Sequence, residues 1–300
     1  MSAVFATHDQ LAIRKESALL IDYPTIKREI LDRYGVGPSE SFDAAAACRA
    51  RVDYLKNFLR TTGLTGFVLG ISGGVDSSTA GRLAQLACEE LRAEGREATF
   101  YAVRLPAGVQ RDENDAQDAL RFINPDKIIT INIGNTSSVL NAACVSALEA
   151  VGTHLSPAQM DFHKGNIKAR ERMAAQYYLA GAYRAAVIGT DHNAECVTGF
   201  YTKFGDGACD LIVLNGMSKN QVRLCAQYMG APDHIWAKLP TADLEELNPG
   251  KLDDEGFGFP YDALNDFLEG KSIAPEIETR IVDKYVATRH KREPIVEFPG

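Results

Sequence analysis

The chain has 300 residues, of which 45% are hydrophobic and 24% charged, a composition typical of a globular protein with a large core. Its 32 basic and 40 acidic side chains give a net charge of −8, which disfavours a nucleic-acid-binding function, because phosphate backbones require dense lysine and arginine. There is no run of about 18 apolar residues and no charged start followed by an apolar stretch, so we expect neither a membrane span nor a signal peptide.

The first half of the chain alternates between helical and extended patterns. Residues 1–40 favour a helical arm interrupted at Pro24, since proline breaks helix interiors. The next pattern, over residues 43–62, is a clear amphipathic helix. Strands are then expected at 67–72, 98–105, 127–133 and 185–189, and helices at 77–93, 112–122, 136–150 and 166–183. This alternation predicts an α/β fold with a doubly wound, mainly parallel sheet and helices on both faces.

The last third is less regular. Helices are expected near 218–229, 261–268 and 275–290, whereas residues 240–260 are rich in proline, glycine and acids and are predicted to form a loop. We find no internal repeat and no low-complexity linker, which favours a single domain over residues 1–300 with a helical arm at 1–40. The six cysteines contain no C-x-x-C pair, so a zinc ribbon is disfavoured and a reducing, cytoplasmic location is expected.

The strongest local pattern is the segment Ser72–Ser78, SGGVDSS, between an apolar strand and a helix. Glycines allow the backbone to approach a ligand closely, and a helix start offers free N–H groups that suit phosphate. Asp76 beside phosphates indicates a bridging Mg²⁺. The segment has neither the lysine of a Walker loop nor the spacing of a dinucleotide fingerprint. The alternative is an ordinary strand-to-helix turn in which Asp76 caps the helix.

This segment resembles the pyrophosphate loop of the N-type ATP pyrophosphatases, which form adenylates and release pyrophosphate. Four further segments resemble the ammonia-dependent NAD synthetases: GNIKARERM at 165–173, GTDHNAE at 189–195, TGFYTKFGDG at 198–207 and LPTADL at 239–244. The resemblance implies an adenine nucleotide alpha hydrolase-like fold. It also implies a cytoplasmic homodimer that uses ATP to convert deamido-NAD to NAD with ammonia, through an NAD-adenylate.

The same resemblance implies a role for individual residues. ATP would be bound by Gly70, Ile71, Ser72, Gly73, Gly74, Val75, Asp76, Ser77, Arg104, Gln110, Thr190, Lys219 and Thr241. Mg²⁺ would be held by Asp76 and Glu195. Deamido-NAD would be bound by Arg170, Lys203, Asp210, His290 and Lys291, with Phe162 and Tyr177 stacking on its rings. The catalytic residues would be Asp76, Lys219 and Asp210.

The chemistry accounts for these residue types. A nicotinate carboxylate resists nucleophiles because it is anionic and its oxygen leaves poorly, and adenylation removes both obstacles. Mg²⁺, Lys219 and the loop amides can stabilise the charge that develops on the departing pyrophosphate. Ammonia reacts as neutral NH₃, so a carboxylate that holds ammonium and assists proton loss is needed. We assign this role to Asp210 as a hypothesis. One departure from the family pattern is Ala208, where a glycine is usual.

Other interpretations remain open from the residues alone. Glu195, four positions after Asp191, fits a solvated helix end, and His290 and Lys291 fit the cationic end of a helix. His192 is interpreted as a packing or capping histidine without chemistry. No cysteine stands in a recognisable glutaminase signature, so we expect ammonia as the nitrogen donor. The alternative functions are another adenylating enzyme, such as one that modifies tRNA, and a non-catalytic nucleotide sensor.

Overall fold

The computed structural model describes residues 22–108, 113–238, 241–242, 246–247, 251–295 and 297–298. Its centre is a five-stranded sheet in the order β3-β2-β1-β4-β5, and all four neighbouring pairs are parallel. The strands are β1 Gly66–Gly70, β2 Thr99–Arg104, β3 Lys127–Thr130, β4 Ala186–Gly189 and β5 Leu211–Ile212. Two short antiparallel strands, β6 Thr241–Ala242 and β7 Lys251–Leu252, lie outside this sheet.

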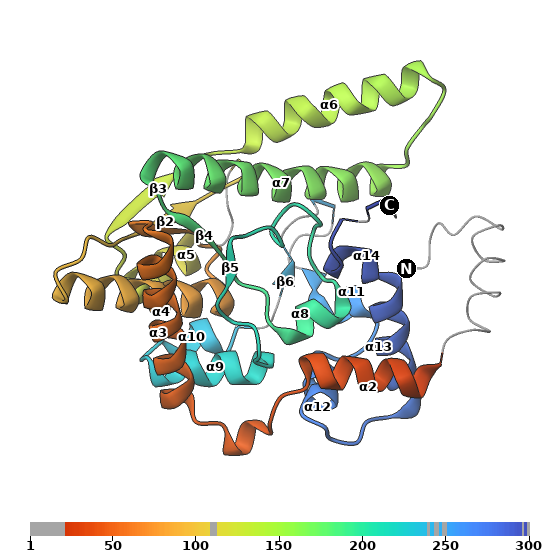
Figure 1. Cartoon of the computed structure of the whole chain (residues 1–300). Coiled ribbons are helices and arrows are strands. Elements are labelled where there is room, and N and C mark those ends of the chain that lie inside the picture. Colours follow the sequence, from red (N-terminus) through yellow and green to blue (C-terminus); the bar gives the residue numbers. More distant parts are fainter. Residues whose placement is uncertain are drawn as a thin grey trace.

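Helices surround the sheet (Figure 1). In chain order the described α-helices are α2 Tyr23–Tyr34, α3 Ala44–Thr62, α4 Val75–Ala93, α5 Glu113–Ile123, α6 Gly134–Ala150, α7 Pro157–Tyr183, α8 Asn193–Thr198, α9 Lys219–Tyr228, α10 Asp233–Trp236, α11 Asp253–Phe257, α12 Tyr261–Leu268, α13 Pro275–Ala287 and α14 Arg289–Arg292. A 3₁₀ turn, η1, spans Ser39–Ser41. Among the described residues, every helix is too short or too polar to cross a lipid bilayer.

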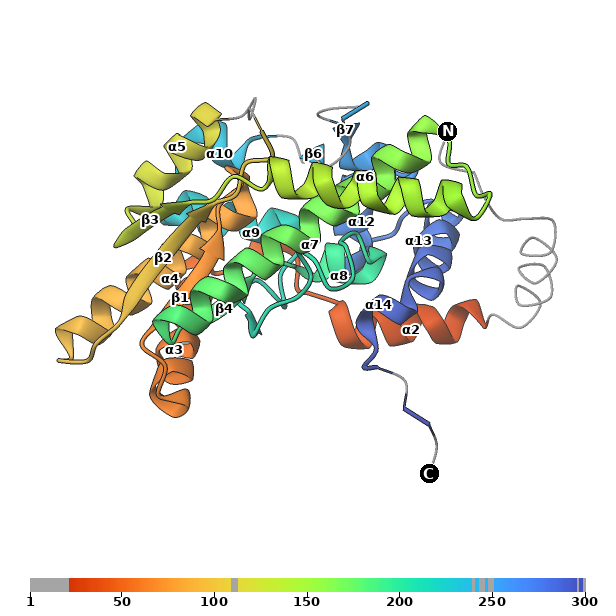
Figure 2. The same ribbon diagram turned by 90° about the horizontal axis from the view of Figure 1, so that it is seen from above.

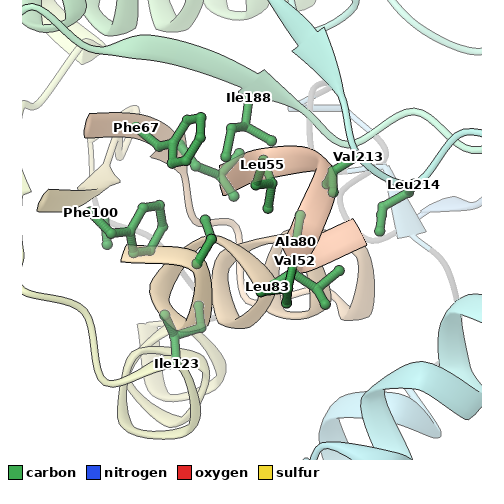
Figure 3. Packing of buried hydrophobic residues seen from close by; sticks show 14 of the residues in the cluster. Val52, Leu55, Phe67, Ala80, Leu83, Phe100, Ile123, Ile188, Val213 and Leu214 are labelled. Carbon is green, nitrogen blue, oxygen red and sulfur yellow. The ribbon is translucent and has the colours of Figure 1, made fainter. Parts of the chain in front are cut away.

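Strand β1 is apolar on both faces because each face packs on helices. On one face of β1, Phe67 belongs to a core with Leu55 of α3 and Leu83 of α4 (Figure 3). Val68 points to the opposite face, where it packs with Leu179 of α7. The two layers lie on opposite sides of the sheet in Figure 1. The side-chain period of two in a strand thus explains why this run of residues is continuously apolar, and the predicted fold class is confirmed.

A third apolar cluster lies beside the sheet and joins helices that are far apart in sequence. It contains Ile30 of α2, Val197 of α8, Leu264 of α12 and Ile281 of α13, all fully buried. The short helix α8 has six residues and would be marginal alone, since isolated helices of this length do not form in water. Its position therefore depends on packing by the carboxyl-terminal helices.

Most expected elements agree with the structure, but some do not. The predicted interruption at Pro24 agrees with the structure, because α2 begins at Tyr23 with Asp22 as its N-cap and the proline lies in the first turn, where its missing N–H has no helical partner to lose; residues 1–21 of the predicted arm lie outside the described residues. Helix α7 begins at Pro157 rather than 166, because Ser156 and Gln159 form a capping box at its start. The predicted loop at 240–260 contains β6, β7 and α11, and β5 was not predicted.

Candidate functional site

Three helices begin close together at one edge of the sheet. Helix α4 follows β1, α8 follows β4 and α9 follows β5, and the carboxyl ends of parallel strands share one edge. Asp76 is the second residue of α4 and Lys219 is the first residue of α9. Their side chains meet, with Lys219 Nζ 2.6 Å from Asp76 Oδ2. The structure therefore joins two predicted catalytic residues that are 143 positions apart.

The loop before α4 needs glycine for two independent reasons. Gly73 has a φ of +91°, and a Cβ there would lie 2.9 Å from the backbone nitrogen of Ala116. The turn is then braced by serines, because Ser72 N donates to Ser77 Oγ at 3.3 Å and Gly74 N donates to Ser72 Oγ at 3.3 Å. Gly74 has no side chain with which to cap α4. This geometry suits the binding of an anion at the helix start.

Asp76 is a charged group in a largely dry position, with 19% of its side chain exposed. Burial by itself raises the pKa of Asp76, but the Lys219 ammonium and other nearby positive groups, Arg223 among them, together outweigh it and hold that pKa below its ordinary value. In the part of the chain that the structure describes, Asp76 Oδ1 has no hydrogen-bond partner. An ionised carboxylate with a free oxygen is a competent ligand for a divalent cation.

His192 is a packed, buried histidine, which is one of the two roles expected from the sequence, and it lies between the predicted metal ligands. It is fully buried, and its Nε2 lies 3.5 Å from Glu195 Oε1, 3.8 Å from Asp76 Oδ1 and 3.2 Å from the Tyr261 hydroxyl. It occupies the N-cap position of α8, but its side chain makes no capping hydrogen bond. Burial, reinforced by Lys219, lowers the pKa of His192 to about 3, so the imidazole is neutral. The sequence feature that pointed to this position is the spacing of three residues between His192 and Glu195, which brings the two side chains to one side of a helix start.

The donor set fits the metal that the sequence suggested. Asp76, His192 and Glu195 each offer a ligand atom, and these atoms lie within 4.8 Å of one another. Mg²⁺ prefers carboxylate oxygens and usually keeps water and phosphate among its ligands. Asp76 at the end of the phosphate loop and Glu195 on α8 bring two carboxylates together beside the expected phosphates. Both residues are therefore compatible with Mg²⁺.

The other predicted ATP contacts lie at strand ends or beyond the described residues. Arg104 ends β2, is 2% exposed and donates to both Glu113 carboxylate oxygens at 3.2 and 2.9 Å. Thr190 directly follows β4. Gln110 lies outside the described residues, and Thr241 is described only as backbone in β6. Arg104 and Thr190 therefore lie at the carboxyl ends of their strands, on the same edge of the sheet as the phosphate loop.

The predicted deamido-NAD cations gather around the loop that follows α8. Lys203 Nζ donates to the His290 carbonyl at 2.6 Å, and Lys291 Nζ donates to the carbonyl oxygens of Gly199 and Tyr201 at 2.7 and 2.6 Å. Arg170 of α7 donates to the Lys203 carbonyl at 3.3 Å. The side chains of Arg170, Lys203 and Lys291, with the backbone carbonyl of His290, thus tie α7 and α14 to this loop and form one cationic group.

Asp210 and Tyr177 form a separate pair. Asp210 precedes β5, accepts from Val187 N at 2.7 Å and lies 3.5 Å from the Tyr177 hydroxyl. Burial, and then the Asp210 charge, raise the pKa of Tyr177 to about 12. Phe162 lies nearer the start of α7 than Tyr177 does, and it is 55% exposed. Ala208 does not have a positive φ, so the usual glycine is not required there.

A polar cavity of about 380 Å³ opens beside the predicted site but contains none of its residues. It is lined by Ala107, Gly108, Asn132, Gly134, Asn135, Ser138, Lys164, Lys168 and Glu246. Lys164 and Lys168 each lie 2.9 Å from the Glu246 carboxylate. Glu246 offsets one of these two positive charges and already occupies both ammonium groups, so the cavity is a weaker anion site than the phosphate loop.

Comparison with known proteins points in one direction. Residues 47–295 match the family model described as NAD synthase. The chain is 51% identical to an NH(3)-dependent NAD(+) synthetase from Burkholderia cenocepacia, over 90% of this chain and 94% of the relative. Two solved structures are similar. NAD+ synthetase from Burkholderia pseudomallei has a TM-score of 0.76 and 46% identity, covering 90% of this chain and 97% of that one. NMN synthetase from Francisella tularensis has a TM-score of 0.73 and 30% identity, covering 86% and 99%.

Proposed function

The chain belongs to the NAD synthase family, and from this premise we propose how its residues carry out the amidation of deamido-NAD. In that reaction ATP adenylates the nicotinate carboxylate, pyrophosphate leaves, and ammonia displaces AMP from the acyl carbon. The observation that carries the assignment of the site is the convergence of Asp76, Lys219 and Glu195 at the glycine loop.

The loop from Gly70 to Ser77 binds the phosphates of ATP. Its glycines let the backbone approach the ligand, and the start of α4 contributes its partial positive charge. Asp76 and Glu195 would hold Mg²⁺, which when bound stabilises the negative charge that develops on the departing pyrophosphate. Lys219 is 3% exposed and begins α9, and when ATP binds its ammonium donates to a phosphate oxygen and stabilises the charge that develops there. Arg104 and Thr190 position the rest of the nucleotide.

Deamido-NAD lies along the cationic group that joins the loop after α8 to α14. Arg170, Lys203, His290 and Lys291 can neutralise its phosphates and carboxylate, and the hydrogen bonds from Arg170, Lys203 and Lys291 to backbone carbonyls of the same region support this role by bringing these residues together. Phe162 and Tyr177 on α7 offer aromatic surface for its rings. Asp210 holds the incoming ammonium. The 3.5 Å distance between Asp210 and the Tyr177 hydroxyl supports this proposal, because Tyr177 is the residue proposed to contact a substrate ring.

The α6–α7 pair offers a surface for a second copy of the chain. Helix α6 packs on the outer side of α7 and crosses it at an angle (Figure 2). It buries only Ser137 among its described side chains, while Val139 is 70% and Leu140 46% exposed. Apolar side chains on an uncovered helix indicate an interface, so we assign the homodimer contact to this surface. All six cysteines are free, which supports a cytoplasmic location.

The first experiment measures the two half-reactions separately. Pyrophosphate release from ATP should require deamido-NAD, whereas NAD should form only after ammonia is added. A tRNA-modifying enzyme would need tRNA instead, and a nucleotide sensor would release no pyrophosphate. Nicotinate mononucleotide as the acceptor tests the activity named for the Francisella relative. Asp210→Asn should impair amide formation more than adenylation, and equal loss of both steps would count against the role of Asp210.

A further inference from the structure

Lys219 is bound to one oxygen of Asp76, and the other oxygen, Oδ1, is the one left for a metal ion. Its ammonium lies 2.6 Å from Asp76 Oδ2 and 5.7 Å from the centre of the Tyr261 ring. The lysine side chain is 4% exposed, so it has little access to water as an alternative partner. An ammonium and a divalent cation at contact distance from one carboxylate repel each other strongly where water is scarce.

The charges of the cluster indicate when the ion can enter. Asp76 and Glu195 contribute two negative charges and Lys219 one positive charge. The sum is −1 without a metal and +1 with a divalent ion, and Arg223 adds further positive potential at Asp76. A buried net positive charge is unfavourable without a counter-ion. The phosphates of a nucleotide are that counter-ion, and they offer Lys219 a new partner.

We propose that Lys219 keeps divalent metal away from Asp76 until a nucleotide accepts its ammonium, so that the metal does not occupy the empty enzyme. This inference rests on the proposed function, because it takes Asp76 and Glu195 as the metal ligands. It assigns Lys219 a second role, in which the residue that grips phosphate in the complex is also the internal cation of the free protein. The consequence is coupled binding of metal and nucleotide.

The test uses Mn²⁺ alone as the probe, with free ion measured by electron paramagnetic resonance and no nucleotide present. Wild type should bind Mn²⁺ weakly, and Lys219→Met should bind it roughly tenfold more tightly or better, since one repelling charge is gone. Lys127→Met, at an exposed lysine of β3, should leave the affinity unchanged. Lys219→Gln serves as a second variant if the methionine protein does not fold.

The outcomes separate this inference from the function on which it rests. If wild type and both Lys219 variants bind Mn²⁺ with equal affinity, or if none of them binds it, the proposal that Lys219 excludes metal from Asp76 is overturned. Adding Asp76→Asn to Lys219→Met should abolish the gained binding. If the double variant keeps it, the metal lies elsewhere and the assignment of Asp76 as a ligand fails instead. Gained binding that depends on Asp76 supports both statements.

Discussion

At the scale of single residues, Asp76 is the side chain on which most of the proposed chemistry depends. Asp76→Asn keeps the volume but removes the charge that would hold the metal and Lys219. We expect adenylation to fall by roughly 100-fold or more, the usual size of a lost electrostatic contribution to a transition state. The rate is read from pyrophosphate release at saturating ATP. Asp53→Asn, at an exposed site on α3, is the control, and comparable rates in the two variants would contradict the role.

A second residue gives the site a pH signature. Asp191 is 8% exposed, and burial, followed by the charges of Asp206 and Asp76, raises its pKa to about 7. The unfolded chain ionises it near its ordinary value of 3.8, so its contribution to stability is lost as the pH rises through 7. The melting temperature of Asp191→Asn should therefore exceed that of wild type, and the difference should be larger at pH 8 than at pH 5. A gain that is the same at both pH values, or larger at pH 5, would show that Asp191 is not held neutral.

Sequence patterns identify functional residues only where a motif surrounds them. Asp76, Glu195 and Lys219 were predicted with the family resemblance, and the structure brings them together. His192 was not assigned chemistry, because a sequence does not reveal that a side chain is fully buried between two carboxylates and a tyrosine. Nor could it reveal that Asp210 contacts Tyr177 rather than the phosphate loop.

At the scale of elements, one side chain connects helix α7 to the phosphate loop. Gln176 Oε1 accepts from Gly70 N at 2.7 Å, and its amide nitrogen donates to the Arg172 carbonyl at 3.2 Å. Gln176→Leu leaves the Gly70 N–H without this partner and should cost about 1–3 kcal/mol of unfolding free energy. Urea denaturation measures the loss. Gln227→Leu, on the exposed side of α9, should change stability by less than about 0.5 kcal/mol.

Elements with their own pattern were predictable, and elements that depend on partners were not. The strands β1, β2 and β4 are apolar because both of their faces are covered. Strand β5 has two residues, and its pairing with β4 depends on the sheet already formed. The strands β6 and β7 likewise form only as a pair. Local composition suggested a loop there, since neither segment has a strand-length pattern.

At the scale of the whole molecule, the α6–α7 surface should control assembly. Val139→Glu introduces a charge on an exposed helix position, so it should leave the folded subunit intact but weaken association. Light scattering coupled to size exclusion should show a dimer for wild type and a monomer for the variant. Tyr228→Glu, at a 59% exposed site on α9, should remain a dimer. A dimeric Val139→Glu protein would place the interface elsewhere, and a monomeric wild type would contradict the proposed dimer itself.

The whole account depends on where ATP and its metal bind. The direct measurement is a crystal structure with a non-hydrolysable ATP analogue, deamido-NAD and Mn²⁺, in which anomalous scattering locates the ion. We expect the anomalous peak between Asp76 and Glu195, the phosphates on the amides of residues 72–77, and Lys219 Nζ on a phosphate oxygen. An ion and triphosphate elsewhere, for instance in the cavity lined by Lys164 and Lys168, would contradict it.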